Sequence, residues 1–272
     1  MQHQEVEPPQ ALRDTIQSFW YTGMDLGELP ARFEVVPDGY AEIIFHFGSG
    51  CSISTAGGVQ PLPSPFLVGL LNQPALFIAQ NRLELIGIRC FPWAVFDLLG
   101  LPAGQDGVRA LAHPLAQLQA ALAEWMRAGQ VAEALAEVTQ AFLTAQVGVA
   151  RDRLLSQAGD AMRAAGGTLP VSQVAAAAHA TVRTLERKFK QAAGYTVKDV
   201  SSLMRFEQVR FRIWLQPAAS LASLAQDLGY ADQAHLGREF KRYSGTTPAA
   251  FARKAKHWQQ AVSTDFVAFI LA

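Results

Sequence analysis

Basic and polar side chains recur at helical spacing in the stretch "TVRTLERKFKQAAG", residues 181–194. Thr181 is suited to cap the start of a helix there, Leu185 and Phe189 would form its inner face, and Gly194 would end it. Arginine can pair with guanine through two hydrogen bonds, and lysine neutralises phosphate, so the opposite face could contact DNA. For a single helix, a solvated basic face is the more frequent explanation. The outer face carries Arg183, Thr184, Arg187, Lys188 and Gln191.

A shorter helical pattern precedes this one. Ser172 is expected to cap a helix that runs through Ala178, and the "AHA" that follows predicts a tight turn. The small alanines of the first helix would let the basic helix pack closely across it. Helix, short turn, helix is the arrangement in which the second helix enters the DNA major groove.

The same plan is repeated further along the chain. "ASLASLAQDLGYADQAHLGREFKRYSG" predicts a helix over Leu221–Leu228, a turn at Gly229, and a second helix from about Asp232 to Tyr243 with Asp232 as its N-cap. Between the two copies, "KDVSSLMRFEQVRFRIWLQ" is long enough for one connecting helix. Two basic units held apart by a helix can address consecutive turns of one DNA face, roughly 34 Å apart. The outward residues of the second copy are Gln233, His235, Arg238 and Arg242.

Residues of roughly 152–254 resemble the DNA-binding domain of the AraC/XylS family of bacterial transcription regulators. The similar pieces are "VAAAAHATVRTLERKFKQAAG", "LMRFEQVR" and "LASLAQDLGYADQAHLGREFKRYSGTTPAAFAR". The resemblance implies an all-helical domain of seven helices that reads two adjacent major-groove segments. The signature residues in register are Ala225, Gly229, Tyr230, Asp232, Gln233, His235, Arg238, Phe240, Lys241, Gly245, Pro248 and Phe251.

The resemblance also implies roles for single residues. It places base contacts on the second helix of each helix-turn-helix unit and phosphate contacts beside them. The sequence departs from the family pattern at three positions. Leu236 stands where a phenylalanine is usual, Gly237 lowers the helix propensity by about 1 kcal/mol, and Arg212 stands where an apolar residue is usual at the end of the connecting helix. The implied base contacts are Arg183, Arg187, Gln233, His235 and Arg238; Thr181 and Lys188 are implied phosphate contacts, and Thr184 and Arg242 complete the DNA-binding set.

The charge of the chain is divided between its halves. The 272 residues carry no net charge, but residues 1–150 hold 6 Lys or Arg against 14 Asp or Glu, and residues 151–272 hold 17 against 9. A basic half joined to an acidic half suggests two domains, one of which meets a polyanion. The N-terminus has no secretion signal, no apolar run reaches a membrane span, and two cysteines make no disulfide framework, so a cytoplasmic protein is expected.

The expected fold class is α+β, with three parts and a tail. Short apolar runs such as Ala41–Phe47, separated by Gly, Pro and Asn, predict a small β-barrel or sandwich-like domain over 1–110. A helical linker follows over 111–150, broken at Gly129. The all-α domain with two helix-turn-helix units and a connecting helix occupies 151–256. The tail, 257–272, is expected to dock on a neighbouring surface through Phe266, Phe269 and Ile270.

Four residues of the acidic half are candidates for a small-molecule site. If Glu42 and His46 line the inside of a barrel, they are polar handles in an apolar pocket, Arg89 could grip a carboxylate, and Trp93 could form a wall. A polar row on the solvated face of the sheet is the more frequent alternative. The six histidines are scattered, so neither a metal nor another cofactor is expected.

Three functions remain open at this stage. The first is a sequence-specific transcription regulator. Its expected partners are double-stranded DNA, RNA polymerase, a small-molecule effector and a second copy of the chain; no membrane is expected among them. The second is a DNA-repair or DNA-modifying enzyme with the same DNA reader; it would need a nucleophile such as Cys51 or Cys90, and neither thiol has a basic cluster nearby to lower its pKa. The third is a protein-binding module whose basic helices serve only solubility.

Overall fold

The chain forms two compact units. The computed structural model describes residues 2–101, 107–147 and 152–261. The N-terminal unit takes most of the chain before residue 152, and the C-terminal unit takes the chain from Asp152. The phenylalanines and isoleucine of the expected tail docking lie outside the described residues.

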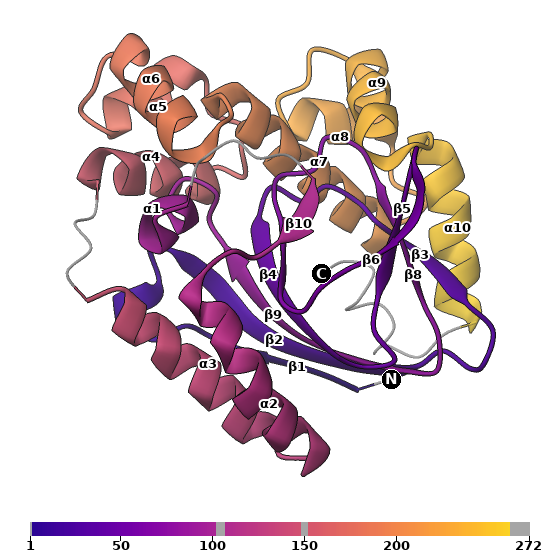
Figure 1. Ribbon diagram of the computed structural model, residues 1–272. Coiled ribbons are helices and arrows are strands. Elements are labelled where there is room, and N and C mark those ends of the chain that lie inside the picture. The colour runs from indigo at the N-terminus through magenta and orange to yellow at the C-terminus, as the bar shows by residue number, and fades with distance from the viewer. Residues whose placement is uncertain (1, 102–106, 148–151, 262–272) are drawn as a thin grey trace. The chain divides into compact units, whose positions relative to one another are not determined.

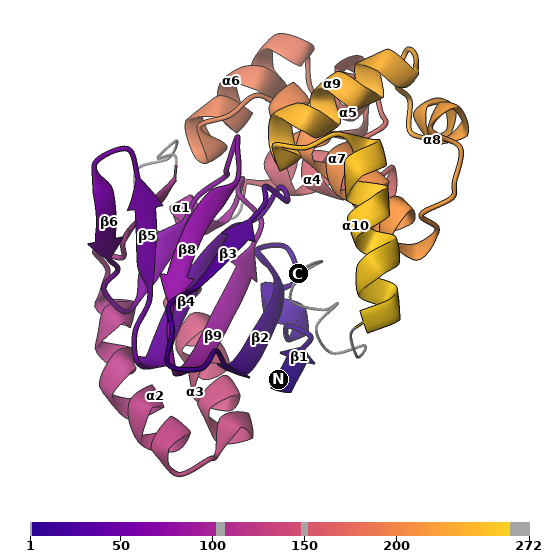
Figure 2. The same ribbon diagram turned by 90° about the vertical axis from the view of Figure 1, so that its right-hand side faces the viewer.

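The N-terminal unit is a sandwich of two antiparallel sheets (Figure 1). Figure 2 shows the four-stranded sheet in front, with its strands side by side. The six-stranded sheet has the order β1 (Gln2–Val6), β2 (Ile16–Asp25), β9 (Arg82–Cys90), β4 (Ala41–Gly48), β7 (Phe66–Val68), β10 (Val108–Ala110). The four-stranded sheet has the order β3 (Ala31–Val35), β8 (Ala75–Ala79), β5 (Ser52–Thr55), β6 (Gly58–Pro61).

Side chains alternate between two buried faces on the central strands. Ile43 of β4 pairs with Ile88 of β9, and both belong to a core that α2 and α3 cover. The next pair, Glu42 and Arg89, faces the other side. On that side Phe66 of the larger sheet lies 6.1 Å from Phe77 of the smaller one.

The long strand β2 was not expected from the sequence. Eight of its ten residues are buried, so the strand lacks the polar alternation that marks a half-solvated strand. It pairs with β9 from Ile16 to Asp25 and completes the centre of the larger sheet.

Helices and 3-10 turns complete the N-terminal unit. The expected break at Gly129 is confirmed, since this residue has a φ of 72° between α2 and α3. The helical residues there are η1 (Gln10–Leu12), α1 (Val95–Leu99), η2 (Pro114–Gln117), α2 (Leu118–Arg127) and α3 (Val131–Ala145).

The described part of the C-terminal unit contains seven helices, as the resemblance implied. One expected cap is wrong: α5 begins at Val171 with Pro170 as its N-cap, so Ser172 lies inside the first turn of the helix. The last helix also runs to Ala261, into the expected tail. The seven are α4 (Arg153–Ala164), α5 (Val171–Ala177), α6 (Val182–Ala193), α7 (Val197–Leu215), α8 (Leu221–Asp227), α9 (Gln233–Ser244) and α10 (Pro248–Ala261).

Candidate DNA interface

The first basic helix, α6, is capped at both ends as its sequence predicts. The Thr181 hydroxyl accepts a hydrogen bond from the Thr184 main-chain N–H at 3.2 Å, and Gly194 ends the helix in the left-handed conformation with a φ of 80°. Leu185 and Phe189 are fully buried beneath it. The helix is therefore held against the core by one face, and the opposite face is turned outward.

Four of the expected contact residues on this unit differ in their accessibility. Arg183 and Arg187 are exposed, whereas Thr184 is half-buried and shares a 3.0 Å hydrogen bond with the Thr181 hydroxyl. Lys188 is also half-buried, and its ammonium group forms an ion pair with Asp152 at the start of α4. No local pattern in the sequence indicates this partner, which lies 36 residues away.

The second basic helix, α9, repeats the plan of α6. The Asp232 carboxylate accepts a hydrogen bond from the His235 N–H at 2.6 Å, and Gly245 ends the helix with a φ of 70°. Leu236 and Phe240 are buried on its inner face. The outward set has Gln233, Arg238 and Arg242 exposed and His235 half-buried.

The turns before the two basic helices also match. His179 stands one residue beyond the C-cap of α5 with a φ of 51°, and Gly229 stands in the same place after α8 with a φ of 70°. Left-handed backbone at this point turns the second helix across the first. Two copies of one capped helix-turn-helix unit, each with an exposed polar face, therefore flank α7 in the chain.

Family comparisons agree with this geometry. Residues 174–254 match a family model described as a helix-turn-helix domain, and residues 4–106 match one described as a domain of unknown function, DUF6597. The fold and the site thus define a helix-turn-helix DNA-binding protein. The signature of the second unit resembles that of AraC-type DNA-binding transcription regulators. No curated protein sequence matches the chain closely enough to count as a relative.

Several solved structures are similar to the chain. ToxT from Vibrio cholerae O395 is 8% identical, with 88% of this chain and 99% of that chain covered and a TM-score of 0.47. An AraC-type transcriptional regulator from Chromobacterium violaceum is 21% identical, with 38% and 91% covered and a TM-score of 0.35. The DNA-binding domain of AdpA in complex with a target DNA is 21% identical, with 41% and 100% covered and a TM-score of 0.36.

The candidate ligand residues of the N-terminal unit do not form a surface row, so that alternative is wrong. Glu42 and Arg89 are directly opposite each other on β4 and β9, both are buried, and Arg89 Nε donates to Glu42 Oε1 at 2.9 Å. Trp20 Nε1 donates to the same oxygen at 3.3 Å. Arg89 therefore pairs with a carboxylate of its own chain, and Trp20 is a third member that was not among the predicted ligand residues.

Trp93 is connected to this pair through a chain of aromatic rings, whereas His46 lies on the same strand as Glu42. The Arg89 guanidinium lies 5.2 Å from the centre of the Tyr40 ring, Tyr40 lies 6.0 Å from Phe91, and Phe91 stacks on Trp93 at 5.1 Å. His46 lies on the same face of β4 as Glu42, and its Nε2 is 3.1 Å from the carbonyl of residue 62. Burial lowers the pKa of His46, against the weaker effect of hydrogen bonds to the main chain.

Both cysteines are buried. Burial raises the pKa of Cys51 to about 11 and that of Cys90 well above the ordinary value. A thiol acts as a nucleophile only as the thiolate, so neither residue is prepared for a group-transfer reaction. Within the described ranges, no three His, Cys, Asp or Glu residues gather as a metal site, and no helix is both long and apolar enough to cross a membrane.

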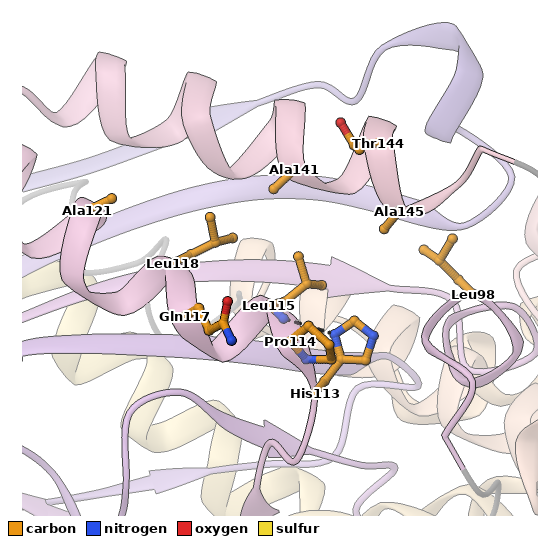
Figure 3. A pocket seen from close by; sticks show the side chains of 10 residues that line it. All are labelled: Leu98, His113, Pro114, Leu115, Gln117, Leu118, Ala121, Ala141, Thr144 and Ala145. Carbon is orange, nitrogen blue, oxygen red and sulfur yellow. Dashed lines mark hydrogen bonds between the residues drawn. The ribbon is translucent and has the colours of Figure 1, made fainter.

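One pocket of about 480 Å³ lies along the helical side of the N-terminal unit (Figure 3). Leu98, Leu115 and Leu118 line it, and His113 stands at one end. The His113 Nδ1 accepts the Leu115 N–H at 3.1 Å, and burial lowers the pKa of His113. The pocket contains none of the four candidate ligand residues.

Proposed function

We propose that the C-terminal unit binds one operator with both helix-turn-helix units, α6 and α9 each occupying one of two adjacent major-groove segments. The observation that carries this proposal is the repetition of one capped unit with an exposed polar face on each second helix. The helix between the copies supports it, because the 19 residues of α7 span about 28 Å, close to one turn of DNA.

The side chains proposed to contact DNA have two kinds of role in this arrangement. Arginine and glutamine suit the acceptor and donor groups on base edges, and hydroxyl and ammonium groups suit phosphate. A phosphate would share or replace the ion pair that joins Lys188 to Asp152. The proposed base contacts are Arg183, Arg187, Gln233, His235 and Arg238, and the proposed backbone contacts are Thr181, Thr184, Lys188 and Arg242.

Selection of binding sites from random duplex DNA, followed by titration with salt, tests this proposal. A preferred sequence with two segments about one turn apart, and a steep fall in affinity as salt rises, are expected from two units that neutralise several phosphates. Uniform binding to every sequence would contradict the base contacts. A flat response to salt, or no binding at low salt, would instead favour the protein-binding module.

For the N-terminal unit we propose a small-molecule effector held near Glu42, Arg89, His46 and Trp93. The support is the buried Glu42–Arg89 pair with its aromatic neighbours inside a β-sandwich. A polar ligand could replace one of these side chains as the partner of the other. A homodimer and a contact with RNA polymerase complete the proposed partners. Native mass spectrometry of the full chain purified from cells tests the effector: a mass that leaves on denaturation supports it, and the bare chain mass favours a domain that only organises assembly.

A further inference from the structure

Tyr230 fills the turn between α8 and α9. Its side chain is buried, and its hydroxyl donates a hydrogen bond to Glu239 Oε1 on α9 at 2.7 Å. The guanidinium of Arg205, on α7, lies 5.3 Å from the centre of the Tyr230 ring. Arg205 also pairs with Glu239 at 3.6 Å, where the two side chains are only 15% and 12% exposed. The three side chains therefore hold one another within the protein, away from the exposed face of α9.

This network is anchored outside the second helix-turn-helix unit. Arg205 donates to the Gly167 carbonyl at 3.0 Å and to the Ser202 hydroxyl at 3.1 Å. Gly167 has a φ of 77°, and a Cβ there would lie 2.3 Å from the Ser201 carbonyl oxygen, so only glycine lets this loop approach α7 so closely. The position of the Tyr230 ring is thus set from α7 and from the loop after α4.

His235 rests against the Tyr230 ring. The two ring centres are 5.3 Å apart and the rings are nearly perpendicular, at 82°. The His235 Nδ1 accepts the Ala231 main-chain N–H at 3.5 Å, a long hydrogen bond. A neutral imidazole that accepts at Nδ1 carries its hydrogen on Nε2. The ring is therefore supported on one side by Tyr230, and the arrangement leaves Nε2 as a hydrogen-bond donor.

We propose that Tyr230 is a positioning residue that holds His235 as a donor toward an acceptor on a base edge, and that Glu239 and Arg205 hold Tyr230 in place. This inference rests on the proposed function, in which His235 contacts a base. An Nε2–H donor suits N7 or O6 of guanine, N7 of adenine or O4 of thymine, and it is mismatched with the amino group of cytosine. Without the ring beside it, the imidazole gains rotamers that do not point at the base, and discrimination falls.

The experiment is binding-site selection with the full chain, followed by dissociation constants for single-base replacements in the preferred site. His235→Ala identifies the base pair that His235 contacts, where discrimination should fall about tenfold. Tyr230→Leu should lose about as much at that same pair. Tyr230→Phe keeps the ring but loses the bond to Glu239, and Glu239→Gln loses the ion pair with Arg205, so each should lose roughly threefold. The matched control is the base pair that Arg183 of the first unit contacts. Discrimination at that base pair should not change in any of these variants.

The double variant separates positioning from general loosening. If Tyr230 acts through His235, Tyr230→Leu should cause no further loss in the His235→Ala background. Additive losses, or an equal loss at the Arg183 base pair, would overturn the inference. If Tyr230→Leu does not fold, Tyr230→Phe in the same two backgrounds gives the same comparison. If His235→Ala changes the discrimination at its base pair but the Tyr230 variants do not, only the positioning role of Tyr230 is refuted. If His235→Ala changes nothing, the base contact of His235 is refuted as well.

Discussion

Lys188 of α6 is joined by an ion pair to Asp152, the N-cap of α4. The same carboxylate accepts the Leu154 N–H at 3.0 Å. Burial raises the pKa of Asp152, but the hydrogen bond and charge of Lys188, with the main-chain donors, lower it by more, so the net pKa is below the ordinary value. A lowered carboxyl pKa means that the stabilisation is present above the ordinary pKa and is lost as the pH falls through the lowered one. At neutral pH the pair is intact, and a DNA phosphate must compete with Asp152 for Lys188.

Asp152→Asn tests this competition, because asparagine caps a helix as well as aspartate does but carries no charge. We expect tighter DNA binding at low salt by a few-fold, and a salt dependence steeper by about one unit, because Lys188 becomes available to phosphate. Fluorescence anisotropy against labelled operator measures both. The control is Asp152→Asn with Lys188→Gln, which should show no gain; an equal gain there would show that Lys188 is not the residue released.

Arg238 and Arg242 are both exposed on α9 but have different proposed roles. Arg238→Ala should cost about 1–3 kcal/mol at the preferred site and relax specificity at one base pair. Arg242→Ala should weaken binding to all sequences alike and lower the salt slope by about one unit. Dissociation constants on the preferred site and on single-base replacements distinguish the two. A uniform loss with Arg238→Ala would remove it from the base contacts.

Gly237 lies inside α9, and a Cβ built there meets no atom within 4 Å. Gly237→Ala should therefore raise the free energy of unfolding by about 1 kcal/mol through helix propensity alone, without a steric cost. Urea unfolding followed by circular dichroism measures it. Gly237→Pro is the opposite control, since it removes a helical hydrogen bond and should destabilise the domain by about 3 kcal/mol. A destabilised alanine variant would mean that α9 is not a continuous helix at this point.

Glu42 and Arg89 form a pair whose side chains are 11% and 10% exposed. Glu42→Gln leaves the Arg89 charge buried without its carboxylate and should destabilise the N-terminal unit by about 3 kcal/mol. Glu42→Gln with Arg89→Gln removes both charges and should cost less than the single change. Thermal unfolding of the three proteins measures this. A single variant as stable as the parent would show that water reaches the pair.

The thiols of Cys51 and Cys90 should be unreactive in the folded protein. With a pKa of about 11, roughly one Cys51 in a thousand is ionised at pH 8, and burial also raises the pKa of Cys90 well above its ordinary value. An aromatic disulfide reagent should label neither within the time in which it labels both in denaturant. One rapidly labelled thiol, or transfer of an alkyl group from DNA to either cysteine, would restore the repair-enzyme hypothesis.

Local features of the DNA-binding unit could be predicted from the sequence. The caps at Thr181 and Asp232, the left-handed ends at Gly194 and Gly245, and the buried faces of α6 and α9 depend on residues within a few positions of one another. The wrong cap at Ser172 shows the limit: α5 begins at Val171 with Pro170 as its N-cap, and capping preferences alone do not fix a helix end to the residue.

Long-range partners were decided only by the tertiary structure. Strand β2 was not predicted, because burial on both faces removes the alternation of polar and apolar residues that identifies a strand. The pairing of Glu42 with Arg89 depends on the register of β4 and β9, and a slip of one residue in either strand would put the two charges on opposite faces of the sheet. The Asp152–Lys188 pair likewise depends on how α4 packs beside α6. Periodicity and capping are set by neighbours in the chain, whereas these contacts join residues 36 and 47 positions apart, whose distance follows only from the packing of the whole domain.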